Sequence, residues 1–160
     1  MVGVLLPGVQ HLQNIHPLVV HFPIAFLTGA ALVYFLALVL QKNTTAVTAF
    51  SLLILGAVSA AAAAGTGLYA EPGVMVSRSV RNNLLEPHET LMLVTAGMSI
   101  LLVFWAVFAR PFPKKGRAFF LLLLVILLGV MAFGADYGAR MVYDYNAGGN
   151  ACPQPIEFTR

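Results

Sequence analysis

Three histidines at the borders of apolar segments are the residues of this sequence best suited to chemistry. His16 and His21 lie in the string HPLVVHFP at residues 16–23, and His88 follows Pro87. Ionisable side chains are costly inside a bilayer and usually face the interior of a helix bundle. Imidazole is also a common metal ligand. Histidines on two different apolar segments therefore predict one bound centre between them, and haem b is the cofactor that we expect.

The five-residue spacing within the first pair separates its two members. Residues five apart lie about 140° apart around an ideal helix, so His16 and His21 are not expected to serve the same coordination position. We predict His21 and His88 as the axial ligands, since two axial imidazoles suit electron transfer. His16 is expected to support a ligand, to replace one, or to form part of a quinol site.

Small residues follow both predicted ligands at helical spacing. The steps from His21 lead to Ala25, Thr28 and Gly29, and those from His88 lead to Met92, Thr95, Ala96 and Ser99. The similarity of the two stripes favours a pocket for a flat macrocycle, although stripes of small residues also serve close helix packing.

Other polar residues offer supporting chemistry. Arg140, like Arg78 and Arg81, has the guanidinium group that binds carboxylates through paired hydrogen bonds, and haem propionates are such carboxylates. Ordinary interfacial charge is the alternative, and we favour it for any single arginine. Cys152 is the only cysteine, so no internal disulfide is expected, and it lies in no C-x-x-C-H motif for covalent haem attachment.

The composition places these residues on membrane helices. The chain is 59% hydrophobic and only 9% charged, whereas soluble proteins average about 25% charged residues. Charged residues are absent from four stretches close to the roughly 20 residues that cross a bilayer as helix: 17–40, 46–70, 90–109 and 118–135. We predict an all-α membrane protein: one domain over 1–160, a four-transmembrane-helix bundle with spans at about 17–40, 46–70, 88–109 and 118–138.

Two of these spans carry further local signals. Pro23 removes a backbone hydrogen bond and predicts a kink beside His21 if the helix already includes His16. In the second span, Gly56, Ala60 and Ala64 have the spacing that lets membrane helices approach closely. Residues 1–16 carry no Lys or Arg, so we expect no cleavable signal and a retained first span.

Charge placement predicts the orientation. The two short connections between spans hold five cations and no acids: Lys42, Arg110, Lys114, Lys115 and Arg117. All six acids fall on the other side of the predicted bundle. The positive-inside rule puts the basic connections in the cytoplasm. We therefore expect a multi-pass protein of the bacterial inner membrane, with both termini and all four histidines on or near the periplasmic side.

The sequence resembles an uncharacterised family of small bacterial four-helix membrane proteins that are sometimes fused or adjacent to c-type cytochromes. The string at residues 16–23 carries most of this resemblance. The small-residue second span, His88 and the terminal segment around Arg140 and Tyr143 carry the rest. The resemblance implies a haem-linked redox module. Asp136 stands where the family often has a histidine, so a ligand at that position is not expected here.

These observations favour a membrane subunit of a respiratory or photosynthetic electron-transfer complex. It would bind haem b, pass electrons between quinol and a periplasmic cytochrome, and act as a non-catalytic subunit of an oxidoreductase. Expected partners are lipid, quinone and a c-type cytochrome or other redox subunits, in a hetero-oligomer. No soluble region is available for nucleic-acid binding. The alternatives are a haem-free quinone-interacting, anchoring or assembly subunit, or a small transporter, which the lack of mid-span charges disfavours.

Overall fold

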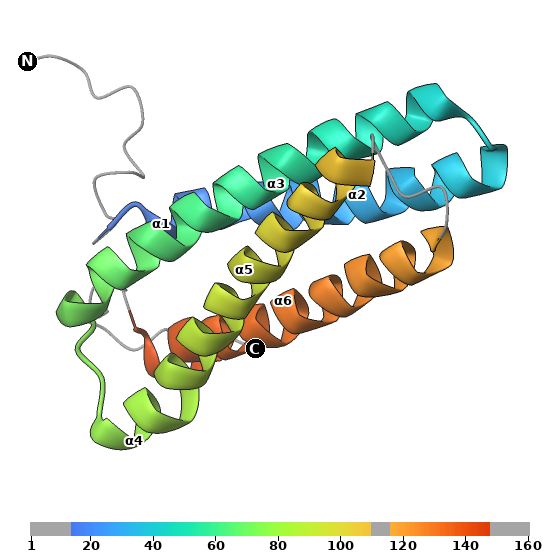
Figure 1. Cartoon of the computed structure of the whole chain (residues 1–160). Helices are drawn as coiled ribbons and strands as arrows, with labels where there is room; N and C mark the ends of the chain where they lie inside the picture. The colour runs from blue at the N-terminus through green and yellow to red at the C-terminus, as the bar shows by residue number, and fades with distance from the viewer. Residues whose placement is uncertain (1–13, 110–115, 148–160) are drawn as a thin grey trace, which may run out of the picture.

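A computed structural model describes residues 14–109 and 116–147 of the chain (Figure 1). Predictions on His11, Cys152 and the basic residues 110–115 lie outside the described residues. The elements follow in the order α1 (His16–Val19), α2 (His21–Leu40), α3 (Asn43–Ala70), η2 (Glu71–Gly73), α4 (Arg78–Val80), η3 (Arg81–Leu85), α5 (Glu86–Ala109) and α6 (Arg117–Tyr145). The described residues contain helices and no strands, which confirms the all-α prediction.

Four helical segments are long and apolar enough to cross a membrane. They are His16–Leu40, Asn43–Gly73, Arg78–Ala109 and Arg117–Tyr145, and each contains one of the four spans expected from the sequence. Two hairpins, α2–α3 and α5–α6, lie side by side (Figure 1). Around the bundle α2 contacts α3, α3 contacts α5, α5 contacts α6 and α6 contacts α2. The predicted four-helix membrane bundle is therefore confirmed.

The first span is interrupted beside His21, as Pro23 predicts. Helix α1 ends at Val19, and α2 begins at His21. Pro23 has no N–H to donate to the carbonyl of Val19, four residues earlier, so a regular helix cannot run through this point. Pro17 is tolerated because it lies in the first turn of α1. The backbone at Val20 keeps helical dihedral angles, so α1 and α2 together form one membrane-length segment, His16–Leu40.

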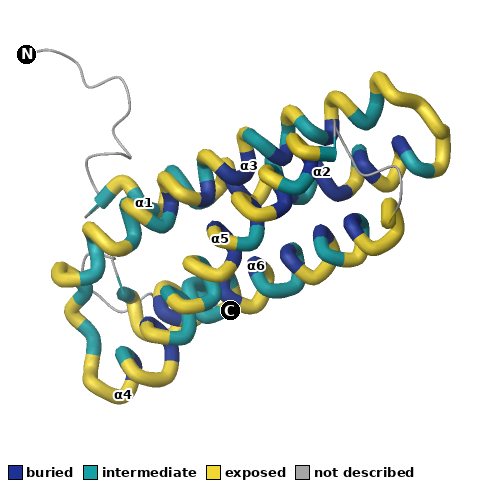
Figure 2. The backbone as a smooth tube through the Cα atoms, in the orientation of Figure 1, coloured by how far each residue is buried: buried dark blue, intermediate teal, exposed yellow. Residues whose placement is uncertain are grey.

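The bundle is apolar both inside and outside. The fully buried side chains include Leu27, Leu53, Leu124 and Leu127, one or two from each of three helices. The outward faces are also apolar but exposed (Figure 2). A helix that is apolar all round suits a bundle whose outer surface contacts lipid. At Gly56 an added Cβ would lie only 2.5 Å from the Leu27 side chain, so this glycine lets α3 approach α2 closely.

One end of the bundle is closed by aromatic rings, and we call it the aromatic end. It contains Tyr34 of α2, Trp105 of α5, and Phe119 and Phe120 of α6. The ring of Phe120 lies 5.2 Å from that of Tyr34 and 5.4 Å from that of Trp105, both edge to face. This is a favoured geometry for aromatic pairs. The Tyr34 hydroxyl also donates to the Arg117 carbonyl at 3.5 Å.

The opposite end, which we call the histidine end, contains His16, His88 and residues 71–85. A small apolar cluster of Val80, Leu84, Leu85 and Met141 joins η3 to α6 there. Arg81 of η3 pairs with Glu71 of η2. These contacts hold the 71–85 segment against the ends of the helices and so fix the place where α5 begins.

Candidate functional site

His16 and His88 meet at the histidine end. Their ring centroids are 6.4 Å apart and their planes are nearly perpendicular, at 83°. His16 is the first residue of α1, which leads directly into the α2–α3 hairpin, and His88 lies in the first turn of α5. The first hairpin with its preceding α1 therefore contributes one ring, and the second hairpin contributes the other. Both residues are partly buried. We call these two residues the histidine pair.

The surroundings of His88 decide which of its nitrogens carries the proton. Its Nδ1 lies 2.7 Å from the carbonyl oxygen of Gly134 on α6. A carbonyl only accepts hydrogen bonds, so Nδ1 must carry the hydrogen and donate it. In the neutral ring, Nε2 then has a free lone pair. This assignment follows from the hydrogen-bond network.

The surroundings of His16 lead to the same tautomer by a different route. Its Nδ1 lies 3.1 Å from Oγ1 of Thr66 on α3. The Thr66 hydroxyl donates its single hydrogen to the Ala63 carbonyl at 2.9 Å. The Thr66 oxygen is therefore left to accept, and Nδ1 of His16 donates to it. Nε2 of His16 also keeps a free lone pair.

A glycine makes room for each ring. A Cβ added at Gly67 would lie 3.0 Å from Cε1 of His16, and one added at Gly138 would lie 2.9 Å from Cε1 of His88. Real Cβ atoms are rarely this close to a neighbouring atom. Each imidazole therefore lies on the second helix of its own hairpin, at a place where that helix has no side chain.

The donor set of the histidine pair suits a particular kind of metal centre. Histidines that bind metals usually donate their second ring nitrogen to a carbonyl or similar acceptor, as both rings do here. Two imidazoles that bind one metal from opposite sides need a centroid spacing of roughly 6 Å, given metal–nitrogen bonds of about 2 Å. The described residues contain no group of three or more His, Cys, Asp or Glu side chains that could hold a metal. Since zinc usually takes at least three protein ligands, the pair better suits a metal whose other positions are already filled.

The structure does not bring His21 to this pair. His21 is exposed at the start of α2, on the far side of the interruption at Val20. Of the residues that follow it at helical spacing, Ala25 is exposed as well. The assignment of His21 and His88 as ligands stays a prediction, because the geometry does not test it. In the structure it is His16, and not His21, that lies beside His88.

The small residues below His88 pack helices. Thr95, Ala96 and Ser99 are buried. The hydroxyls of Thr95 and Ser99 donate to carbonyls of their own helix, at 2.8 Å each. Met92 occupies the space beside Gly134. The sequence allowed this stripe either to face a macrocycle or to pack against a neighbouring helix. The structure shows it packed inside the bundle.

The arginines near this end have acidic neighbours. Arg140 of α6 is about half exposed, and its Nε lies 3.8 Å from Asp144, one turn later. Arg81 pairs with Glu71. An exposed pair between neighbouring turns contributes little to stability, so the guanidinium of Arg140 is free to exchange its partner for another carboxylate.

Sequence reasoning did not find the residues that hold the two rings in place. Thr66 and Gly67 near the end of α3, and Gly134 and Gly138 near the end of α6, were not selected. The spacing in the sequence could have indicated the two glycines, because each histidine is followed by one at nearly the same distance. Gly67 lies 51 residues after His16, and Gly138 lies 50 residues after His88. Glu89, beside His88, was also missed. Its Oε1 is buried and has no hydrogen-bond partner among the described residues.

Comparison with known proteins gives one match. The profile of a family described as "Predicted membrane protein (DUF2231)" matches residues 12–151. The chain belongs to the DUF2231 family. The matched range includes the four long helices and the histidine pair, so membership agrees with the membrane bundle. No curated protein and no solved structure matches the chain.

Proposed function

We propose that this DUF2231 protein binds haem b between its two hairpins, and that His16 and His88 would hold its iron. One observation carries the proposal: both rings donate their Nδ1 hydrogens to acceptors on their own hairpins and keep Nε2 lone pairs at the place where the hairpins meet. Haem brings four nitrogen ligands of its own, so two protein ligands would suffice. When bound, it would supply one-electron transfer.

The contribution of the chain is to fix the two rings before the cofactor arrives. The Gly134 carbonyl and the Thr66 hydroxyl orient the imidazoles, and Gly67 and Gly138 let them lie against the helices. Such supporting contacts raise ligand basicity and restrict rotation. Arg140 lies at the same end of the bundle and is a candidate partner for a haem propionate.

The same proposal extends to the setting of the protein. The positive-inside rule favours the bacterial inner membrane with both termini and the histidine end in the periplasm. A bundle with little surface outside the membrane suits a subunit of a larger complex. We propose membrane quinol on one side of the electron transfer, and a c-type cytochrome or another redox subunit on the other.

A reduced-minus-oxidised spectrum of the protein purified in mild detergent tests this function. We expect a low-spin b-type spectrum. His16→Ala and His88→Ala should each abolish it or convert it to high spin, and His21→Ala should leave it unchanged. Circular dichroism and gel filtration of each variant show whether it remains folded, so a lost spectrum can be assigned to the ligand.

The other outcomes are equally informative. Loss of the spectrum in His21→Ala and His88→Ala, but not in His16→Ala, would overturn our ligand pair in favour of the one predicted from the sequence. Folded wild-type protein that contains no haem after isolation from its native membrane would overturn the haem proposal itself.

A further inference from the structure

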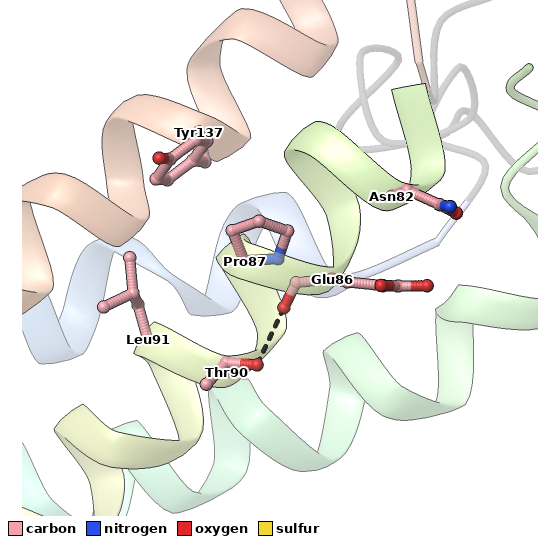
Figure 3. A pocket seen from close by; sticks show the side chains of 6 residues that line it. All are labelled: Asn82, Glu86, Pro87, Thr90, Leu91 and Tyr137. Atoms are coloured by element: carbon pink, nitrogen blue, oxygen red, sulfur yellow. Dashed lines mark hydrogen bonds between the residues drawn. The ribbon is translucent and has the colours of Figure 1, made fainter. Parts of the chain in front are cut away.

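A hollow of about 430 Å³ opens beside the start of α5, on a different face of that helix from the histidine pair. Figure 3 shows Tyr137 of α6 on one side of it and Asn82 and Glu86 on the other, with Pro87 and Leu91 between them. Among the described residues, no hydrogen bond involves the side chain of Asn82 or of Tyr137. The lining therefore combines an apolar floor with a phenol on one side and, on the other, an exposed amide and an exposed carboxylate whose polar ends point away from Tyr137 (Figure 3).

The same face of α5 continues towards the middle of the bundle without obstruction. Glu86, Thr90, Leu93, Gly97, Ile100 and Phe104 recur at helical spacing and are all exposed. At Gly97 an added Cβ would meet nothing within 4 Å. From Glu86 to Phe104 the stripe rises by 18 residue steps, or about 27 Å along an α-helix, which approaches the thickness of the hydrocarbon core.

A second, apolar groove lies at the far end of this stripe. It has a volume of about 240 Å³ and runs between α3 and α5, where Ala57 and Ala61 face Ile100 and Phe104. The small side chains of α3 leave the space that forms the groove. One exposed face of α5 thus joins a polar hollow at the bundle end to an apolar groove within the membrane.

We infer that this face binds an isoprenoid quinone, with its head group in the hollow and its tail along α5 into the groove. The Tyr137 hydroxyl can donate to one oxygen of a quinone ring. Asn82 and Glu86 are exposed, so their side chains can turn towards the ring, where the amide would donate to the second oxygen or the carboxylate would accept from a quinol hydroxyl. Pro87 and Leu91 offer apolar contact to the flat ring. The inference deepens the proposed function, since it names the class of the membrane redox partner and the place where it binds.

The charge of the hollow favours a neutral head group over a phospholipid. Its lining contains one charged side chain, the acidic Glu86, and no Lys or Arg. A phosphate would be repelled by the carboxylate and would lack the cation that usually binds it. A neutral ring with hydrogen-bonding groups at opposite edges meets no such repulsion.

Photolabelling of the full chain in lipid nanodiscs tests the site. The probe is an azido-benzoquinone with a long isoprenoid tail, and labelled peptides are identified by mass spectrometry. We expect labelling within residues 82–91 or at Tyr137, which excess unlabelled long-tailed quinone should prevent. Leu91→Trp, which fills the hollow, should reduce labelling by about tenfold. Labelling elsewhere, or competition by anionic phospholipid but not by quinone, would overturn the inference.

A matched pair of glycine variants tests the path of the tail. Gly97→Leu places a side chain on the stripe. It should weaken the ability of long-tailed quinone to prevent photolabelling, but not that of a tail-less benzoquinone. Gly129→Leu on α6, where an added Cβ also meets nothing within 4 Å, should change neither. Equal effects of the two variants would overturn the assigned path.

Repeating the labelling with His88→Ala separates this inference from the haem proposal. Labelling that persists in a protein without the haem spectrum supports the quinone site on its own. An intact spectrum without specific labelling of the wild type would overturn the quinone site and leave the haem proposal standing.

Discussion

The two ends of the bundle use rings from both hairpins in opposite ways. At the aromatic end, Phe120 lies between Tyr34 and Trp105, and the edge-to-face contacts fill the space between the helices. At the histidine end, His16 and His88 also meet nearly at right angles. Each of these rings, however, is held by one nitrogen and keeps a lone pair on the other.

The rings at the aromatic end fill the space between the helices, whereas the rings at the histidine end leave a nitrogen without a hydrogen-bond partner in the described part of the bundle. Phe120 is fully buried and Tyr34 almost so, and their burial stabilises the bundle. The imidazoles are only partly buried, and glycines replace the side chains that would otherwise fill their places. Changes at the aromatic end should therefore act on stability, whereas under the haem proposal changes at the histidine end should act on the binding of the cofactor.

The largest effect is expected from Phe120→Ala at the aromatic end. Truncation of a fully buried Phe leaves a cavity and typically costs about 3–5 kcal/mol, and here both ring contacts are lost as well. Reversible unfolding in mixed micelles measures the loss. The haem spectrum per folded molecule should be unchanged, and a changed spectrum would contradict the separation between the two ends.

The next largest effect is expected from Gly138→Ala and Gly67→Ala. The new methyl group would displace the imidazole of His88 or His16, and overpacking of this kind typically costs about 1–3 kcal/mol. We expect the haem spectrum to shift towards high spin with little change in helix content. Gly65→Ala is the control, because its Cβ would meet nothing within 4 Å. The same shift in all three variants would show that the fit of the rings is unimportant.

A smaller effect is expected from Thr66→Val. It keeps the shape of the side chain but removes the oxygen that accepts from Nδ1 of His16, and loss of such a supporting contact typically weakens metal binding by about tenfold or more. Titration of haem into the apoprotein measures the affinity. Thr66→Ser should restore it. Thr95→Val, which removes a hydroxyl that bonds only to its own helix, should leave it unchanged.

The smallest effect on stability is expected from Arg140→Gln. The exposed pair with Asp144 is worth at most about 0.5 kcal/mol, so the unfolding transition should barely move. If the guanidinium holds a haem propionate, the reduction potential should shift measurably in a redox titration. An unmoved potential would limit Arg140 to its interfacial role.

Much of the bundle follows from local properties of the chain. Charge-free stretches of bilayer length predicted the four helices, and Pro23 predicted the interruption beside His21. His16 and His21 were expected to serve different positions, because five residues separate them by about 140° on a helix. The sequence could not tell which of the two faces the bundle, since apolar residues surround both.

The sequence by itself determined a four-helix membrane bundle with histidines at one end, because hydrophobicity and helix period are properties of each segment alone. Only the tertiary structure decided that His16 meets His88, because that contact depends on the packing of α1 against α3 and of α3 against α5. It also decided the tautomers, since the acceptors at Thr66 and Gly134 lie 50 and 46 residues away from their rings. Hydrogen bonds across such separations depend on how the helices pack, which no single segment encodes.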